Sequence, residues 1–123
     1  MNTKKIGEYG EKIAAAHLRK KGYRIVEKNY RTRLSEIDII SYDGEILCFV
    51  EVKTRSRTDY GLPCQAVNYR KQQKIINGAL YFMSTHNLQS DVRFDVAEVY
   101  LNKGITIIPK VNIIKNAFET SGR

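Results

Sequence analysis

The sequence predicts one α/β domain in which helices cover a mixed β-sheet, in the order helix, three strands, long helix, two strands. Two segments repeat apolar residues at three- and four-residue spacing, and several short runs are rich in β-branched residues. A chain of 123 residues that is 42% hydrophobic can build one core but not two. The sequence has no linker, repeat or low-complexity stretch, so residues 1–123 are expected to form a single domain.

The first helix and the first strand are predicted from the beginning of the chain. Ile6 to Lys21 has an uneven apolar face, and its Lys and Arg residues gather towards the end, where the helix dipole favours cations. Gly22 is expected to stop this helix. Tyr23 to Tyr30 places apolar residues among charged ones and is predicted to be a strand at an edge of the sheet.

The centre of the sheet is predicted to be a hairpin from Ile37 to Lys53, because two β-branched runs flank Asp43-Gly44. After a polar loop, apolar spacing predicts a long helix from Gln65 to His86, ended by Asn87. The remaining residues predict a strand over Val92–Leu101, a turn over 102–104, a returning strand over Ile105–Ile108 and, over Val111–Phe118, either an extension of the sheet or a short helix.

The composition bounds partner and compartment. The 21 Lys and Arg exceed the 13 Asp and Glu, and the resulting charge of +8 attracts polyanions such as nucleic acid, although many soluble proteins are basic for no specific reason. Cys48 and Cys64 lack the spacing and the nearby histidines of a zinc site or a disulfide framework. No stretch resembles a signal peptide or approaches the roughly 18 apolar residues of a membrane span, so we expect a cytoplasmic protein with no membrane partner.

Three charged residues of the hairpin predict a functional site. Asp38 and Glu51 interrupt apolar runs, and charged residues are depleted in central strands. Side chains alternate along a strand, so Glu51 and Lys53 share one face. If Asp43-Gly44 is the turn, Asp38 lies diagonal to Glu51; if the turn is Gly44-Glu45, Asp38 lies directly opposite Glu51. Either register puts the three side chains on one surface.

This trio suits the hydrolysis of phosphodiester bonds. Carboxylates on adjacent strands lie roughly 5 to 8 Å apart, where they can share a hard cation and repel each other without one, and Mg²⁺ or Mn²⁺ fits best. Lys53 would polarise an attacking water or stabilise charge on a phosphate oxygen. The alternative is an ordinary salt bridge between Asp38 and Lys53 on a half-solvated sheet, with Glu51 as a second acceptor. The apolar surroundings and the basic chain favour the metal site.

Basic residues on both sides of the trio are expected to neutralise phosphates of nucleic acid and to make binding salt-dependent. Tyr30, Tyr60 and Tyr69 lie among them and are candidates for stacking on unpaired bases. The alternative places the tyrosines in a half-buried core and the cations on a solvated face. The candidate phosphate-binding residues are Arg31, Arg33, Arg55, Arg57, Arg70, Lys71 and Lys74.

The spacing of Asp38, Glu51 and Lys53, with Val50 and Val52 around the glutamate, resembles the core motif of the restriction-endonuclease-like, PD-(D/E)xK, nuclease superfamily. From Gly7 to about Val99 the chain resembles the YraN-type bacterial proteins, which are related to archaeal Holliday-junction resolvases. The likeness rests on Gly7 to Glu11, Leu18 with Gly22-Tyr23, Asn29 to Arg31, Glu36 to Ile40, Phe49 to Arg55, Gly61 with Pro63, Ala66-Val67, Lys71 and Arg93 to Val96.

The resemblance implies a restriction-endonuclease-like fold and assigns roles to the site residues. It implies that Asp38 and Glu51 are metal ligands, that Lys53 is the catalytic lysine, and that Glu11 is a carboxylate from the first helix that completes the site as a catalytic residue and metal ligand. Glu8 is the rival to Glu11, and either can instead be a solvated acid of the first helix. Glu36 shares a face with Asp38 as a further ligand or a surface residue.

The resemblance also points to Gln65 and Tyr69, with Lys71, as helix residues that support the site. Two positions depart from the pattern: Ser35 stands where the family usually has Gly, and Ile37 stands where the superfamily has Pro. Neither change removes a charged group, but the first bears on how closely the backbone approaches the site.

Two functions fit these features of the sequence. The first is a Mg²⁺- or Mn²⁺-dependent DNA endonuclease acting on branched or structured DNA, for which cleavage of a four-way junction would require a symmetric homodimer. The second is a catalytically silent nucleic-acid-binding or adaptor module on a nuclease fold. A metabolic enzyme for small anions is disfavoured, because the sequence has no Gly-rich phosphate loop.

Overall fold

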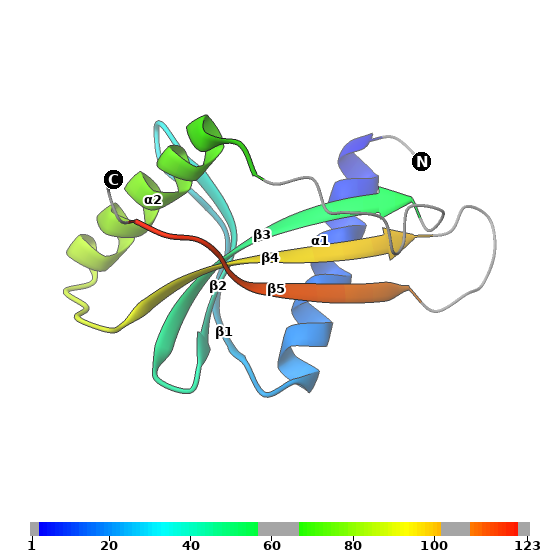
Figure 1. The fold of residues 1–123 in the computed structure, drawn as a ribbon, viewed down its shortest axis with the longest axis horizontal. Helices are drawn as coiled ribbons and strands as arrows, with labels where there is room; N and C mark the ends of the chain where they lie inside the picture. The colour runs from blue at the N-terminus through cyan, green and yellow to red at the C-terminus, as the bar shows by residue number, and fades with distance from the viewer. Residues whose placement is uncertain (1–2, 57–66, 102–108, 121–123) are drawn as a thin grey trace.

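The computed structural model describes residues 3–56, 67–101 and 109–120 (Figure 1). The predicted α/β class and the predicted order of elements are confirmed, and the arrangement is consistent with a restriction-endonuclease-like fold. The elements are α1 (Thr3–Lys20), β1 (Arg24–Arg31), β2 (Glu36–Asp43), β3 (Ile46–Ser56), α2 (Tyr69–Thr85), β4 (Val92–Leu101) and β5 (Lys110–Phe118).

The five strands form one mixed sheet in the order β1-β2-β3-β4-β5. All neighbours are antiparallel except β3 and β4, which run parallel. A parallel pair needs a long crossover connection, and α2 lies in the segment that joins these two strands. The predicted first strand lies at an edge of the sheet and the hairpin strand β3 lies at its centre, as the sequence indicated.

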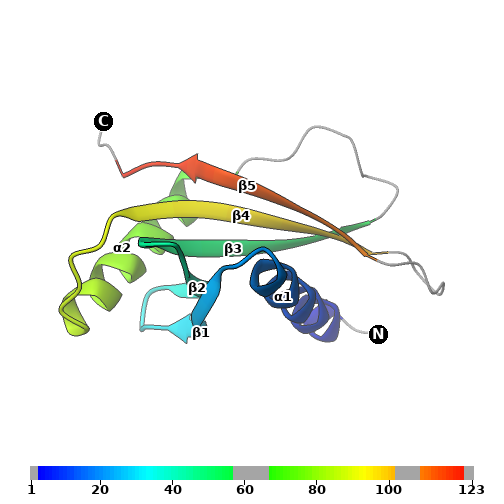
Figure 2. The same ribbon diagram turned by 90° about the horizontal axis from the view of Figure 1, so that it is seen from below.

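The two helices pack against different parts of the core, as Figure 2 shows from below. Consecutive residues of β3 face opposite sides of the sheet, so Cys48 joins the cluster under α1 while Phe49 joins the cluster under α2. Ala14, Ala15 and Leu18 form the buried stripe of α1. None of the helices in the described ranges is long and apolar enough to cross a membrane.

Two predicted boundaries were wrong. The prediction began the second helix at Gln65, but Val67 and Asn68 precede it and α2 begins at Tyr69. Asn68 is its N-cap: the side chain accepts a hydrogen bond from the backbone N–H of Lys71 at 2.8 Å, which the apolar periodicity did not reveal. The first helix begins at Thr3, three residues before the predicted start at Ile6.

The last strand confirms one of the two alternatives for the end of the chain. Residues Val111–Phe118 belong to β5, which pairs antiparallel with β4 through contacts such as Val96 with Ile114, so the short helix is excluded. The predicted turn over 102–104 and the predicted strand over Ile105–Ile108 lie outside the described residues. Asn87, expected to end the second helix, follows α2 with a φ of 53°.

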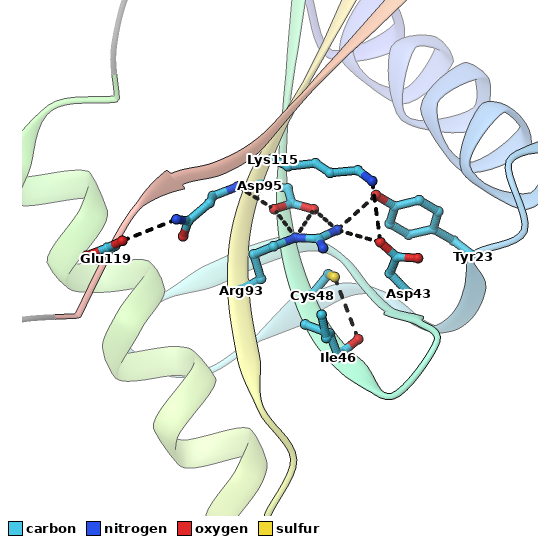
Figure 3. A network of polar contacts seen from close by, with 9 residues as sticks. Tyr23, Asp43, Ile46, Cys48, Arg93, Asp95, Lys115 and Glu119 are labelled. Atoms are coloured by element: carbon cyan, nitrogen blue, oxygen red, sulfur yellow. Dashed lines mark hydrogen bonds and ion pairs between the residues drawn. The ribbon is translucent and has the colours of Figure 1, made fainter.

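A buried ionic network ties together the end of the sheet that carries the hairpin turn (Figure 3). The Arg93 guanidinium donates to Asp95, to Asp43 and to the Tyr23 hydroxyl, each at 2.9 Å. Asp95 is fully buried and also accepts from the backbone N–H of Asn116, whose φ of 55° accompanies an irregularity in the β4–β5 pairing. One arginine thus links β4, β2 and the residues that follow α1.

We expect Arg93→Met to lower the free energy of unfolding by about 3–5 kcal/mol, because it leaves the Asp95 carboxylate buried without its cation. Lys115→Met is the matched control, since Lys115 approaches Asp43 in the same network but its side chain is 59% exposed. That change should cost less than about 1 kcal/mol. Urea denaturation measures both, and equal losses would contradict the structural role given to Arg93.

Candidate functional site

The hairpin adopts the second of the two predicted registers. Asp43 pairs with Ile46, so the turn is Gly44-Glu45, and Gly44 has the positive φ of 63° that such a turn needs. The paired ladder of β2 and β3 runs as far as Ile39 with Val50. One step further along the same register, Asp38 lies opposite Glu51.

The two strands separate at this step, although neither ends there. β2 continues in pairing with β1 as far as Glu36, and β3 continues beside β4 as far as Ser56. Figure 1 shows β1 and β2 turning away from the other three strands. In the gap, the Asp38 side chain accepts the backbone N–H of Val52 at 2.8 Å, in place of a main-chain carbonyl of β2. We call this place, bounded by Asp38 and Glu51, the fork.

Glu51 is a half-buried carboxylate at the fork. Its side chain is 11% exposed, and its Oε1 atom is buried with no hydrogen-bond partner among the described residues. Its Oε2 atom lies 3.7 Å from the ammonium of Lys71. Burial and then the charge of Asp38 raise the pKa of Glu51 to about 7, against the opposing effect of Lys71 and Lys53.

The ionised form of Asp38 is also disfavoured by burial. Burial raises the pKa of Asp38 above its ordinary value, and the hydrogen bond from Val52 and the charge of Lys71 only partly offset this effect. Two neighbouring carboxylates that both resist ionisation, one of them with an orphaned buried oxygen, form an oxygen-only donor set that suits Mg²⁺ or Mn²⁺. The pair at the fork therefore fits the predicted metal.

Glu11 reaches the fork from the first helix, whereas Glu8 is exposed. A side chain at Gly10 would collide with Thr54, so glycine there lets α1 approach β3 closely and brings Glu11 with it. Burial, and then the charge of Asp38, raise the pKa of Glu11, while a hydrogen bond with the Asn29 side chain opposes the shift. Within the described ranges, no three His, Cys, Asp or Glu side chains already form a set that could hold one ion.

Two lysines face these carboxylates, one of them in an unexpected role. Lys53 is half-buried on β3, and its charge acts on Glu51. Across the described residues no ion pair joins Lys53 to Asp38, so the alternative of an ordinary salt bridge between them does not form. Lys71 was predicted to bind phosphate and to support the site from the second helix, and in the structure its ammonium lies 3.7 Å from Oε2 of Glu51. The resemblance pointed to this helix residue near the site, but the apolar periodicity did not place it in the first turn of α2.

The other predicted basic residues fall into three groups. Arg55 is mostly buried and forms an ion pair with Glu98 at 3.1 Å, and Arg31 forms an exposed pair with Glu36 at 3.2 Å. Gly78 of α2 packs against Ser35, which brings the turn between β1 and β2 onto this helix. The exposed cations of that turn and of the first half of α2 are Arg33, Arg70 and Lys74. Arg57 lies outside the described residues.

The residues predicted to support the site and the tyrosines predicted to stack on bases lie in different environments. Tyr69 is 72% exposed, at the start of α2. Tyr30 is half-buried and packs edge-on against Phe82, with ring centroids 5.1 Å apart, so the alternative that made it a core residue is confirmed. Gln65 and Tyr60 lie outside the described residues.

The fold and the fork define an α/β protein, consistent with a restriction-endonuclease-like fold, with a half-buried acidic cluster where its sheet divides. Residues 10–99 match the model of the Uncharacterised protein family UPF0102. UPF0102 proteins of Alkaliphilus metalliredigens, Caldanaerobacter subterraneus and Clostridioides difficile are 50%, 48% and 45% identical, covering 94%, 96% and 96% of this chain and 99%, 98% and 100% of theirs. The chain belongs to the UPF0102 family.

The raised pKa of Glu51 predicts a pH-dependent stability without metal. The folded protein holds this proton up to about pH 7 and the unfolded chain loses it near pH 4.5, so the free energy of unfolding should fall as pH rises between these values. Glu51→Gln should flatten that fall and stabilise the protein at pH 7.5.

Urea denaturation in EDTA at pH 5 and at pH 7.5 measures this difference. Glu45→Gln is the control: it removes an exposed carboxylate from the hairpin turn and should leave the pH difference of the wild type in place. A Glu51→Gln protein with the same pH difference as the wild type would show that Glu51 ionises freely at the fork.

Proposed function

We propose that this protein is a metal-dependent nuclease that hydrolyses phosphodiester bonds in DNA. The single observation that carries the proposal is the half-buried pair of Asp38 and Glu51 at the fork, in which the buried Oε1 atom of Glu51 has no hydrogen-bond partner among the described residues. Structural carboxylates are normally satisfied, as Asp95 is by Arg93. A pair of neighbouring carboxylates with raised pKa values, one of which keeps an unsatisfied oxygen among the described residues, is the arrangement expected of a functional site.

Asp38 and Glu51 are the residues that would hold Mg²⁺ or Mn²⁺, which would lower the pKa of a bound water and polarise a phosphate oxygen. The N–H of Val52 fixes the orientation of Asp38 from the central strand. Glu11 presents a third carboxylate beside Asp38, where it can orient a water or accept its proton. Lys53, which projects from the same face of β3 as Glu51, would stabilise the negative charge that develops on the phosphate.

The charge around the fork supports a polyanionic substrate. The chain carries a net charge of +8, and the exposed cations Arg33, Arg70 and Lys74 lie on the turn and the helix that pack together next to the acidic pair. They would hold the backbone on either side of the scissile phosphate. The resemblance to resolvases favours DNA, and branched DNA in particular, for which a symmetric dimer would supply two active sites.

Asp38→Asn should reduce Mn²⁺-dependent cleavage by about 100-fold or more, because it removes a ligand charge while keeping an acceptor for the Val52 N–H. The assay offers branched, single-stranded and duplex DNA with Mn²⁺ and with EDTA. Asp91→Asn, which changes an exposed acid just before β4, is the control and should cleave like the wild type. No cleavage of any substrate by the wild type, or unchanged cleavage by Asp38→Asn, would overturn the proposal.

Glu8 and Glu11 form a matched pair on one helix, separated by almost one turn. Glu11→Gln should reduce the cleavage rate by at least about 10-fold, because it removes the carboxylate beside Asp38, whereas Glu8→Gln should leave the rate unchanged because Glu8 is exposed. Single-turnover rates on the preferred substrate measure both. The opposite ranking would assign the helix carboxylate to Glu8.

The second candidate is a nucleic-acid-binding or adaptor module without turnover. The observation that favours it is the ion pair between Lys71 and Glu51, because a cation of the protein already lies against the acidic pair. This alternative predicts tight, salt-dependent DNA binding that does not change with metal, in place of the metal-dependent cleavage described above.

A further inference from the structure

Lys71 contacts the acidic pair at the fork from helix α2. Its backbone is fixed in the first turn of α2, where its N–H donates a hydrogen bond to the side-chain oxygen of the N-cap residue Asn68 at 2.8 Å. Its side chain then extends to Glu51, so that the ammonium lies 3.7 Å from Oε2 while the side chain remains 43% exposed. That separation is longer than a charge-assisted hydrogen bond. The contact is thus a loose ion pair on a flexible side chain with a fixed base.

The acidic pair is only partly neutralised by this contact. Oε1 of Glu51 is buried and has no hydrogen-bond partner among the described residues. Lys71 therefore contacts only the other carboxylate oxygen, Oε2. The charge of Lys71 acts on both Asp38 and Glu51, and on Glu51 it acts more strongly than that of Lys53. Among the described residues, Lys71 is therefore the cation that acts most strongly on Glu51.

We propose that Lys71 is an internal counter-ion that a divalent cation displaces from Glu51, and that the released ammonium then binds a phosphate of the substrate. The proposal rests on the proposed function, since it concerns the same metal and the same substrate. A divalent ion bound to Glu51 repels an ammonium at the distance seen here, and the metal forms stronger contacts with carboxylate oxygen. Because the side chain is already half in solvent, it can leave without disturbing the core.

The released Lys71 side chain would lie near other exposed cations of α2. Arg70 adjoins Lys71 in the chain, and Lys74 lies one turn further along α2, on the side that faces Gly78 and its contact with Ser35. Both are exposed. An ammonium that leaves Glu51 therefore joins exposed cations on the surface expected to hold DNA. Metal binding would in this way add one phosphate contact to the protein.

The proposal differs from a purely structural role for the ion pair. An ion pair with a half-exposed lysine contributes little to stability, so Lys71→Met should fold like the wild type. Lys74→Met is the matched control, because it removes the same charge from the same helix without a contact to Glu51. Circular dichroism and urea denaturation check that all three proteins are equally folded.

The first measurement is Mn²⁺ binding in the absence of DNA. Electron paramagnetic resonance of the free Mn²⁺ ion gives the fraction bound. Lys71→Met should bind Mn²⁺ about 2- to 5-fold more tightly than the wild type, the range expected for release from one exposed ion pair, and Lys74→Met should match the wild type. Binding by Lys71→Met alone would also support displacement. Equal or weaker binding by Lys71→Met, or binding by none of the three proteins, overturns the proposal.

The second measurement is the salt dependence of DNA binding, in Ca²⁺ and in EDTA. In Ca²⁺, Lys71→Met should reduce the slope of log K against log salt by about one, whereas in EDTA it should not change the slope. Loss of the same slope in both conditions would mean that Lys71 contacts DNA whatever the metal, and would overturn the coupling. Neither measurement requires cleavage, so an inactive protein that shows both effects would fail the nuclease proposal and still support displacement.

Discussion

The separation of β2 from β3 at Asp38 is the constraint on which the rest of the site depends. Regular pairing would have joined the Val52 N–H to a main-chain carbonyl of β2 and closed the sheet. The Asp38 carboxylate accepts that N–H instead, so the sheet divides without leaving the donor unsatisfied. The opening is what allows Glu11 from α1 and Lys71 from α2, two helices that pack on different clusters, to reach the same acidic pair.

The carboxylates at the two ends of the sheet differ in how fully their oxygens are paired. At the end with the hairpin turn, Asp95 is fully buried, and Arg93 and the Asn116 N–H satisfy it through fixed hydrogen bonds. At the fork, one oxygen of the Glu51 carboxylate has no partner in the described part of the chain, and the other lies at ion-pair distance from a lysine. A fully satisfied network gives rigidity, whereas an incomplete one keeps room for an exchangeable cation. This contrast separates a satisfied ion pair from an incomplete one among the described residues of a single sheet.

Placing a buried acidic cluster in a basic protein has an electrostatic logic for phosphodiester chemistry. The surrounding cations attract the polyanion, while the burial that raises the pKa values of Asp38, Glu51 and Glu11 makes a divalent ion the natural means to restore their charge. A metal-free fork would thus repel phosphate weakly or not at all, and a metal-loaded fork would attract it. Residues 10–99, which match the family model, include Glu11, Asp38, Glu51, Lys53 and Lys71.

The sequence by itself determined the α/β class, the order of elements and the trio of Asp38, Glu51 and Lys53, because hydrophobic periodicity and charges inside apolar strands are local signals. It left the hairpin register and the choice between Glu8 and Glu11 open. Only the tertiary structure placed Asp38 opposite Glu51, brought Glu11 to the fork and turned Lys71 from a surface cation into the partner of Glu51. Those facts depend on where two helices pack against a divided sheet, which is set by long-range contacts such as Gly10 with Thr54, and no local pattern encodes them.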